Sequence, residues 1–229
     1  MGQKTLIIAE KPSVANDLVR ALTPAAGKFD KHDEYFESEG YIVTSAVGHL
    51  LEIKAPEEYD VKRGKWSFAH LPVIPPHFDL APLDKTKTRL NAIVRLVKRK
   101  DVSELINACD AGREGELIFR YILQYVSETK PVKAQIKRLW LQSMTKNAIE
   151  EGFKHLRTDG EMQNLAQAAM CRSEADLAHR HQRFPRPHGV QIAMGRLLPH
   201  ALRPRANPHL IHAGAAGSRA GARSSTCRA

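Results

Sequence analysis

The chain has 229 residues, enough for one sizeable core or two small domains. No apolar run approaches the roughly 20 residues of a membrane span, and Leu6–Ala9 is too short for a signal-peptide core, so we expect a soluble intracellular protein with no membrane partner. Three cysteines without a C-x-x-C pair disfavour disulfides and a zinc ribbon. The net charge of +10 is typical of nucleic-acid binding, but residues 1–176 hold 26 basic and 25 acidic residues, so the excess lies after residue 176.

The first elements are predicted from apolar patterns and turn residues. Lys4–Ala9 is a short run rich in β-branched residues, which predicts a buried strand. A turn through Pro12 and a helix capped by Ser13 are expected next. Phe36–Ser45 then predicts a hairpin around Gly40. The chain therefore begins with strand, helix and strand pair.

Later segments alternate between helix and strand patterns after an extended, proline-rich connector at Leu71–Pro82. The expected elements are a helix within Lys85–Lys100, a strand at Leu105–Cys109, a helix at Glu114–Val126, a strand in the run AQIKRLWL and a helix at Thr145–Leu156 with Thr145 as N-cap. This alternation predicts an α/β fold, a doubly wound, mainly parallel sheet, over residues 1–150. Residues 151–176 are expected to begin a second, helical domain.

Acidic residues gather where two predicted strands end. Glu10 follows the first strand and Asp110 follows the strand at Leu105–Cys109, while Glu114 lies one helical turn later. Such oxygen ligands suit Mg²⁺, and Glu116 is a weaker candidate. Acidic residues are also favoured at a helix N-terminus by the macrodipole, so spacing alone leaves a metal site and an ordinary helix start as alternatives.

Phosphate binding is predicted at the same place. Gly112 and Gly115 allow a tight turn and a close approach of the backbone to a phosphate. Lys11, next to Glu10, would supply a cation for that phosphate.

Five motifs occur together in the order found in type IA DNA topoisomerases. They are IAEKPSVA at Ile8–Ala15, VGHLLE at Val47–Glu52, WSFAHLPVIPPHF at Trp66–Phe78, CDAGREGELI at Cys109–Ile118 and CRSEADL at Cys171–Leu177. Over residues 4–176 the chain resembles the topoisomerase III branch of this family. DAGREGE alone would indicate only a Toprim fold, whereas five ordered motifs are far more specific.

The resemblance implies a Toprim domain in residues 1–150 with Mg²⁺ as cofactor. Glu10, Asp110 and Glu114 correspond to the acidic cluster that binds the metal near the scissile phosphate. Lys11 matches the lysine that positions this phosphate, and Glu10 would protonate the leaving 3′-oxygen, which makes these two the expected catalytic residues. The partner would be single-stranded or negatively supercoiled DNA, acted on by a monomer in the bacterial cytoplasm at the nucleoid.

Other motif positions have weaker assignments. Arg172 would lie along the single-strand groove. The expected DNA-binding residues are Lys11, Arg113 and Arg172, and His49 would support the site. Many Toprim proteins carry a further Asp where this chain has Gly112, which puts a second metal in doubt.

The family cleaves and reseals one DNA strand without ATP, through a 5′-phosphotyrosine link. The five tyrosines of this chain, however, fall outside the segment that would carry the nucleophile: Tyr35, Tyr41, Tyr59, Tyr121 and Tyr125. We therefore expect an amino-terminal fragment, an isomerase by family, that is inactive alone. The alternatives are a Toprim nuclease and a DNA-binding module without catalysis.

The tail from Leu177 to the end holds nine Arg, six His and five Pro, and no Lys, Asp or Glu. It shows no sustained apolar period, which predicts no packed core in residues 177–229. A disordered basic arm, a low-complexity linker and a frameshifted translation remain alternatives. The absence of Lys beside so much Arg, Ala and Pro favours the frameshift.

Overall fold

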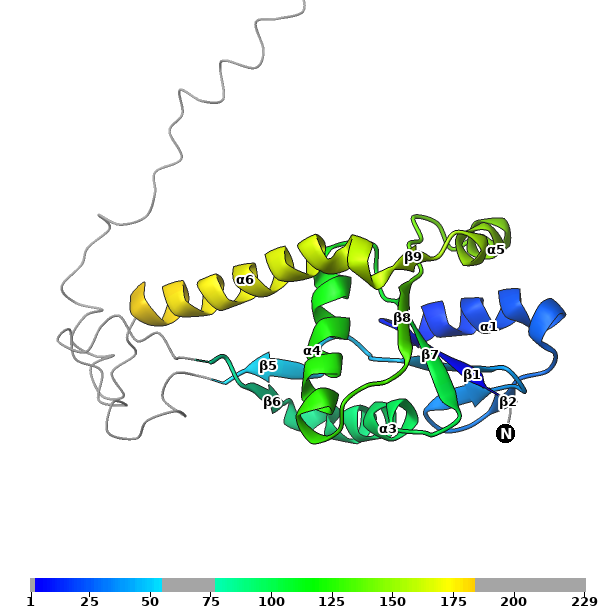
Figure 1. Ribbon diagram of the computed structural model, residues 1–229, viewed down its shortest axis with the longest axis horizontal. Helices are drawn as coiled ribbons and strands as arrows, with labels where there is room; N and C mark the ends of the chain where they lie inside the picture. The colour runs from blue at the N-terminus through cyan, green and yellow to red at the C-terminus, as the bar shows by residue number, and fades with distance from the viewer. Residues whose placement is uncertain (1–2, 55–76, 184–229) are drawn as a thin grey trace, which may run out of the picture. The chain divides into compact units, whose positions relative to one another are not determined.

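The architecture comes from a computed structural model that describes residues 3–54 and 77–183 (Figure 1). These residues lie within one compact unit, Met1–Pro185. In the described part of the chain, seven strands form one sheet in the order β2-β3-β4-β1-β7-β8-β9. In that order the strands are Asp30–Lys31, Tyr35–Glu37, Tyr41–Ser45, Lys4–Ala9, Val102–Ala108, Gln135–Arg138 and Arg157–Thr158.

The middle of the sheet is parallel and its edges are antiparallel. Strand β1 pairs in parallel with β4 and β7, and β7 pairs in parallel with β8. Ala9, the last residue of β1, lies opposite Ser45 on one side and Ala108 on the other. The residues that follow these three strand ends therefore emerge at one edge, which is where open parallel sheets place their functional crevice.

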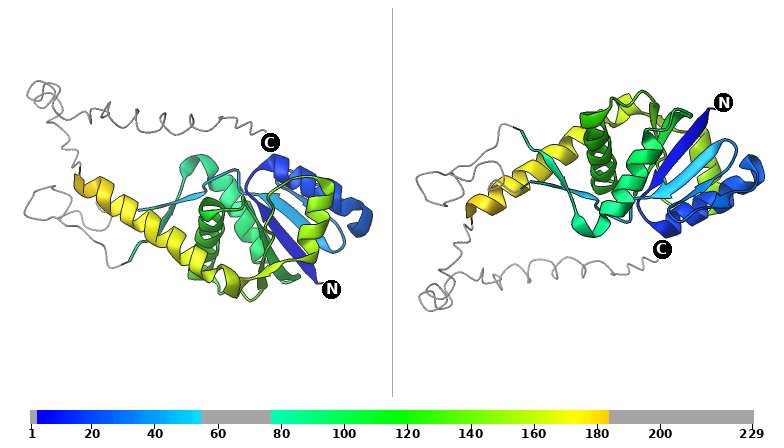
Figure 2. Two further views of the ribbon diagram at one scale, coloured as in Figure 1. Left: turned by 90° about the horizontal axis from the view of Figure 1, so that it is seen from above. Right: turned by 90° about the horizontal axis from the view of Figure 1, so that it is seen from below.

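Helices cover both faces of the sheet, as the views in Figure 2 show. Ile7 and Ala9 pack with α1 (Pro12–Ala26) and α5 (Lys146–Lys154), whereas Leu6 and Ile8 pack with α3 (Lys87–Val97) and α4 (Arg113–Thr129). Successive side chains of a strand point to opposite faces, so one short apolar run anchors both helical layers. The predicted doubly wound, mainly parallel α/β fold is confirmed.

Two helix starts test the predicted caps. Helix α1 begins at Pro12, with Lys11 as its N-cap, so the expectation that Ser13 caps it was wrong. Proline at the first helical position has no N–H to satisfy and a backbone angle already suited to a helix, so the N-cap lies two residues earlier than expected. The Thr145 cap of α5 is confirmed, because its side chain accepts a hydrogen bond from the Ala148 amide at 3.4 Å.

Two short strands stand apart from the main sheet. Leu51–Ile53 (β5) and Leu80–Pro82 (β6) pair antiparallel, so the described end of the predicted connector is indeed extended. A single 3₁₀ turn at Asp84–Thr86 then leads into α3. The rest of the connector, including Trp66, lies outside the described residues.

Helix α6 (Asp159–Arg183) follows β9 and packs on α4. It spans most of the predicted start of a second domain and continues past Leu177, where the tail was expected to begin. Residues 184–229 of that tail lie outside the described part, and the boundary between the two domains stays a prediction. Among the helices within the described ranges, none has the length and apolar character needed to cross a membrane.

Candidate functional site

The structure brings Glu10, Lys11 and Asp110 together at the carboxyl edge of the sheet. Lys11 Nζ lies 2.6 Å from Asp110 Oδ2 and 3.6 Å from Glu10 Oε1. The two carboxylates come from residues 100 positions apart, and they meet because β1 and β7 are parallel neighbours. Hydrogen bonding to Asp110 and the nearby charge of Glu10 raise the pKa of Lys11, so its ammonium stays charged at neutral pH.

One carboxylate oxygen of Glu10 is unpaired among the described residues. Its side chain is 15% exposed, and among the described residues its buried Oε2 has no hydrogen-bond partner. A buried carboxylate oxygen without a donor is costly and calls for a cation or a donor from outside the chain. This oxygen, together with the Asp110 carboxylate, fits the hard ligands that Mg²⁺ takes.

Glu114 lies at the same edge but does not share the Lys11 ammonium. Its side chain is 77% exposed, and its Oε2 lies 3.6 Å from His49 Nε2. Within the described ranges, no three His, Cys, Asp or Glu side chains form a ready metal cage. Because Mg²⁺ keeps several waters and is held by one or two carboxylates plus a substrate phosphate, the Glu10–Asp110 pair fits without a third protein ligand in place.

Glu116, expected as a weaker candidate ligand, faces the interior instead. Its side chain is 2% exposed. Oε1 accepts a hydrogen bond from Arg120 Nε at 2.8 Å, and Oε2 accepts one from Asn107 Nδ2 at 3.0 Å. The acidic first turn of α4 therefore divides its two glutamates between the surface and the core, and only Glu114 remains available at the edge.

The two glycines of the DAGREGE segment differ in the space available for a side chain. A Cβ on Gly115 would clash with the Asp110 carbonyl oxygen and would lie 2.8 Å from the Asp110 amide nitrogen. A Cβ on Gly112 would meet nothing within 4 Å, and its φ of 173° is extended backbone. The close approach that requires a glycine is thus between Gly115 and the backbone of Asp110, which sets the candidate ligand against the start of α4.

Sequence analysis missed two buried polar residues behind Asp110. Asn107 accepts a hydrogen bond from the Cys109 amide through Oδ1, at 3.0 Å. Arg138 donates to the Asp110 carbonyl at 2.7 Å and to the Asn107 carbonyl at 3.3 Å. Burial lowers the pKa of Arg138, and the nearby Glu116 carboxylate opposes that shift. The signal in the sequence was Asn107 within the apolar end of β7, whereas Arg138 ends the mostly polar strand QIKR and carried no such signal.

The remaining candidates are separate from this cluster. Arg113 is exposed at the start of α4, and Arg172 is exposed on α6. Desolvation raises the pKa of the buried Cys109 thiol to about 12, so this cysteine is a packed thiol and not a nucleophile. Tyr121 is buried and donates a hydrogen bond to Ser173 at 2.9 Å.

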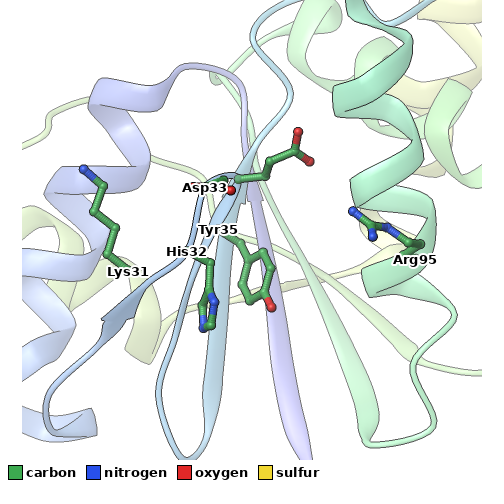
Figure 3. Close-up of a pocket in the computed structure, with 6 residues that line it drawn as sticks. Lys31, His32, Asp33, Tyr35 and Arg95 are labelled. Atoms are coloured by element: carbon green, nitrogen blue, oxygen red, sulfur yellow. The ribbon is translucent and has the colours of Figure 1, made fainter.

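A surface hollow of about 490 Å³, separate from this cluster, lies beside the β2–β3 hairpin (Figure 3). The residues that line it are Lys31, His32, Asp33, Glu34, Tyr35 and Arg95. The lining includes two basic and two acidic residues, and the His32 and Tyr35 rings stack with their centroids 4.4 Å apart. Because these charges balance, the hollow favours neither an anionic nor a cationic ligand. It also contains none of the predicted site residues.

A parallel sheet with acidic strand ends and the segment DAGREGE at the start of a helix is the arrangement of a Toprim domain. The Toprim domain family matches residues 5–144, and the chain belongs to this family. The chain is also 46% identical over 173 residues to the DNA topoisomerase 3 of Staphylococcus haemolyticus and 46% identical over 174 residues to that of Bacillus anthracis. Each alignment covers 76% of this chain and 23% of the relative, so the chain spans less than a quarter of the length of these relatives.

Proposed function

We propose that this chain supplies the metal- and phosphate-binding part of a type IA DNA topoisomerase that cleaves and reseals one DNA strand with Mg²⁺ and without ATP. The observation that carries the proposal is the convergence of the Glu10 and Asp110 carboxylates on the Lys11 ammonium, within a Toprim fold. The proposed partner is single-stranded or negatively supercoiled DNA, bound by a monomer at the nucleoid in the bacterial cytoplasm.

Glu10 and Asp110 are the proposed metal ligands. Glu114 is proposed as a further ligand, because its carboxylate is exposed at the same edge, beside His49. When bound, Mg²⁺ would neutralise charge on the scissile phosphate. The carboxylates themselves hold negative charge where the phosphate must approach, which is why the site needs both the ion and Lys11.

Lys11 is proposed to orient the phosphate. Its side chain is about half exposed, and a phosphate oxygen at the sheet edge would replace Asp110 as the acceptor of its hydrogen bond. Glu10 is also proposed as the general acid: its carboxylate would take up a proton on the oxygen that has no donor among the described residues, and would pass that proton to the leaving 3′-oxygen. Arg113 and Arg172, both exposed, are proposed to contact the DNA backbone.

The attacking tyrosine is not proposed from this chain. Among the described tyrosines, Tyr121 is buried, while Tyr35, Tyr41 and Tyr125 are half-buried against the core. Such side chains contribute to packing, and none of them is proposed as the nucleophile. We therefore expect the 229-residue chain alone to leave negatively supercoiled plasmid unrelaxed.

A chimera tests the proposal directly. Residues 4–176 replace the aligned segment of the Bacillus anthracis DNA topoisomerase 3, and relaxation of negatively supercoiled plasmid is measured with Mg²⁺ and with EDTA. Relaxation that requires Mg²⁺ and is lost in the Glu10→Gln and Asp110→Asn chimeras is the expected result. A folded chimera that stays active with Asp110→Asn would refute the proposed role of this carboxylate.

The second candidate function is that of a Toprim nuclease. The observation that favours it is that, among the described residues, no tyrosine lies beside the Glu10 and Asp110 carboxylates. A nuclease would activate water and nick plasmid without a covalent protein adduct. Incubation of the 229-residue chain with supercoiled plasmid and Mg²⁺, followed by gel analysis with and without protease, separates the functions. Nicked product without adduct would establish the nuclease, and unchanged plasmid agrees with the topoisomerase fragment.

A further inference from the structure

Arg138 is among the largest fully buried side chains in the described part of the protein. It ends strand β8, next to β7, and its register partner is Asn107. Removing a charged guanidinium from water is costly, and well-packed apolar residues often replace buried ion pairs without loss of stability. A buried arginine at this position therefore needs an explanation other than stability alone.

Its hydrogen bonds go to the backbone of the segment that carries Asp110. Arg138 Nη2 donates to the Asp110 carbonyl at 2.7 Å, and Nη1 donates to the Asn107 carbonyl at 3.3 Å. Asp110 lies two residues beyond Ala108, the last residue of β7, so the sheet ladder offers its carbonyl no partner. The planar fork of an arginine supplies donors in fixed directions, which holds both carbonyls at once.

The guanidinium is in turn held from two other sides. Glu116 Oε2, on the first turn of α4, lies 3.8 Å from Arg138 Nε. The Trp140 ring centroid lies 5.2 Å from Arg138 Cζ, within cation–π range. Arg138 thus links the end of β7 by hydrogen bonds, and the start of α4 by an ion pair, across the turn between them; its buried Nε has no hydrogen-bond partner among the described residues.

We propose that Arg138 is a positioning residue that aims the Asp110 carboxylate into the metal site. The inference rests on the proposed function, because it concerns the metal that Asp110 would hold. Groups that orient a metal ligand in this way change metal affinity by about 10- to 100-fold when they are removed. Arg138 touches neither metal nor phosphate, and it acts only through the backbone of Asp110.

Binding of Mn²⁺ to the full 229-residue chain tests the proposal, with Mn²⁺ as a spectroscopic stand-in for Mg²⁺. Electron paramagnetic resonance measures free Mn²⁺ during titration, and thermal melting in EDTA measures stability separately. Arg138→Met is expected to weaken Mn²⁺ affinity about 10- to 100-fold. Arg138→Lys keeps the charge but cannot donate to both carbonyls in the same fork, and is expected to fall between Met and wild type.

Val126→Ala is the matched control, because Val126 is buried near the far end of α4. It should lower the melting temperature and leave Mn²⁺ affinity unchanged. A folded Arg138→Met variant with wild-type Mn²⁺ affinity would overturn the inference, as would weakened affinity in Val126→Ala equal to that in Arg138→Met. If the Met variant fails to fold, unchanged affinity in Arg138→Lys overturns it. Absence of Mn²⁺ binding by wild type would overturn the proposed metal site as well, whereas wild-type binding with unaffected variants overturns this inference alone.

Discussion

Gly115 offers the sharpest test of how α4 sets the candidate site. A methyl group at this position would clash with the Asp110 carbonyl oxygen, an atom of the backbone that Arg138 holds at 2.7 Å. Gly112, three residues earlier, has open space where its Cβ would lie. Gly115→Ala and Gly112→Ala therefore add the same methyl group to the same segment, with opposite steric consequences.

The magnitude follows from two opposing effects at Gly115. Forcing a methyl group into packed surroundings costs about 1–3 kcal/mol, and a clash with backbone belongs at the upper end of that range. Alanine inside a helix is favoured over glycine by about 1 kcal/mol, which offsets part of the cost. We expect Gly115→Ala to lower the free energy of unfolding by about 2 kcal/mol. Gly112→Ala, at the N-cap, should change it by at most about 0.5 kcal/mol.

The assay combines urea unfolding of the full chain with Mn²⁺ titration. Because the clash displaces Asp110, Gly115→Ala is expected to weaken both stability and Mn²⁺ affinity, while Gly112→Ala leaves both near wild type. The result that refutes the reasoning is a Gly115→Ala variant with wild-type stability and wild-type affinity. A loss of stability with unchanged affinity would show that the turn yields without moving the Asp110 carboxylate.

Three further predictions concern the stability of the fold. Glu37→Gln should lower the free energy of unfolding by about 1–2 kcal/mol at pH 7, because its hydrogen bonds with Arg99, at 2.7 and 3.1 Å, hold the pKa of Glu37 below its usual value. Because the pKa of Glu37 is lower in the folded state, its carboxylate contributes fully to the free energy of unfolding above the unfolded-state pKa of about 4.3. That contribution is lost as the pH falls through the folded-state pKa. The free energies of unfolding of wild type and variant, measured in urea, should therefore converge in acid. Thr145→Ala removes the side-chain cap of α5 and should cost about 1 kcal/mol in the same assay; no change would mean that the cap is replaced by water. Val47 has a φ of 60°, which strains a β-branched residue, and it is about half exposed. Val47→Asn should therefore raise the melting temperature by a few degrees, corresponding to about 1 kcal/mol, and a lower melting temperature would contradict the strain.

Local patterns were sufficient for most of the fold. The run Lys4–Ala9 is both predicted and observed as a strand with the same bounds, because a short apolar segment of β-branched residues has few other stable uses. The hairpin around Gly40 and the Thr145 cap follow from equally local chemistry. Errors fell at boundaries, as at Pro12, and at the short edge strands β2 and β9, whose two residues each carry no periodic signal.

The sequence by itself determined which acidic residues follow strand ends, and hence that Glu10 and Asp110 belong to one edge of a parallel sheet. Only the tertiary structure decided how the glutamates after Asp110 divide, with Glu114 in solvent beside His49 and Glu116 buried among donors. It also placed Arg138 behind Asp110. The physical reason is that strand order brings together residues about 30 to 100 positions apart in the chain, and the periodicity of a single segment carries no information about such neighbours.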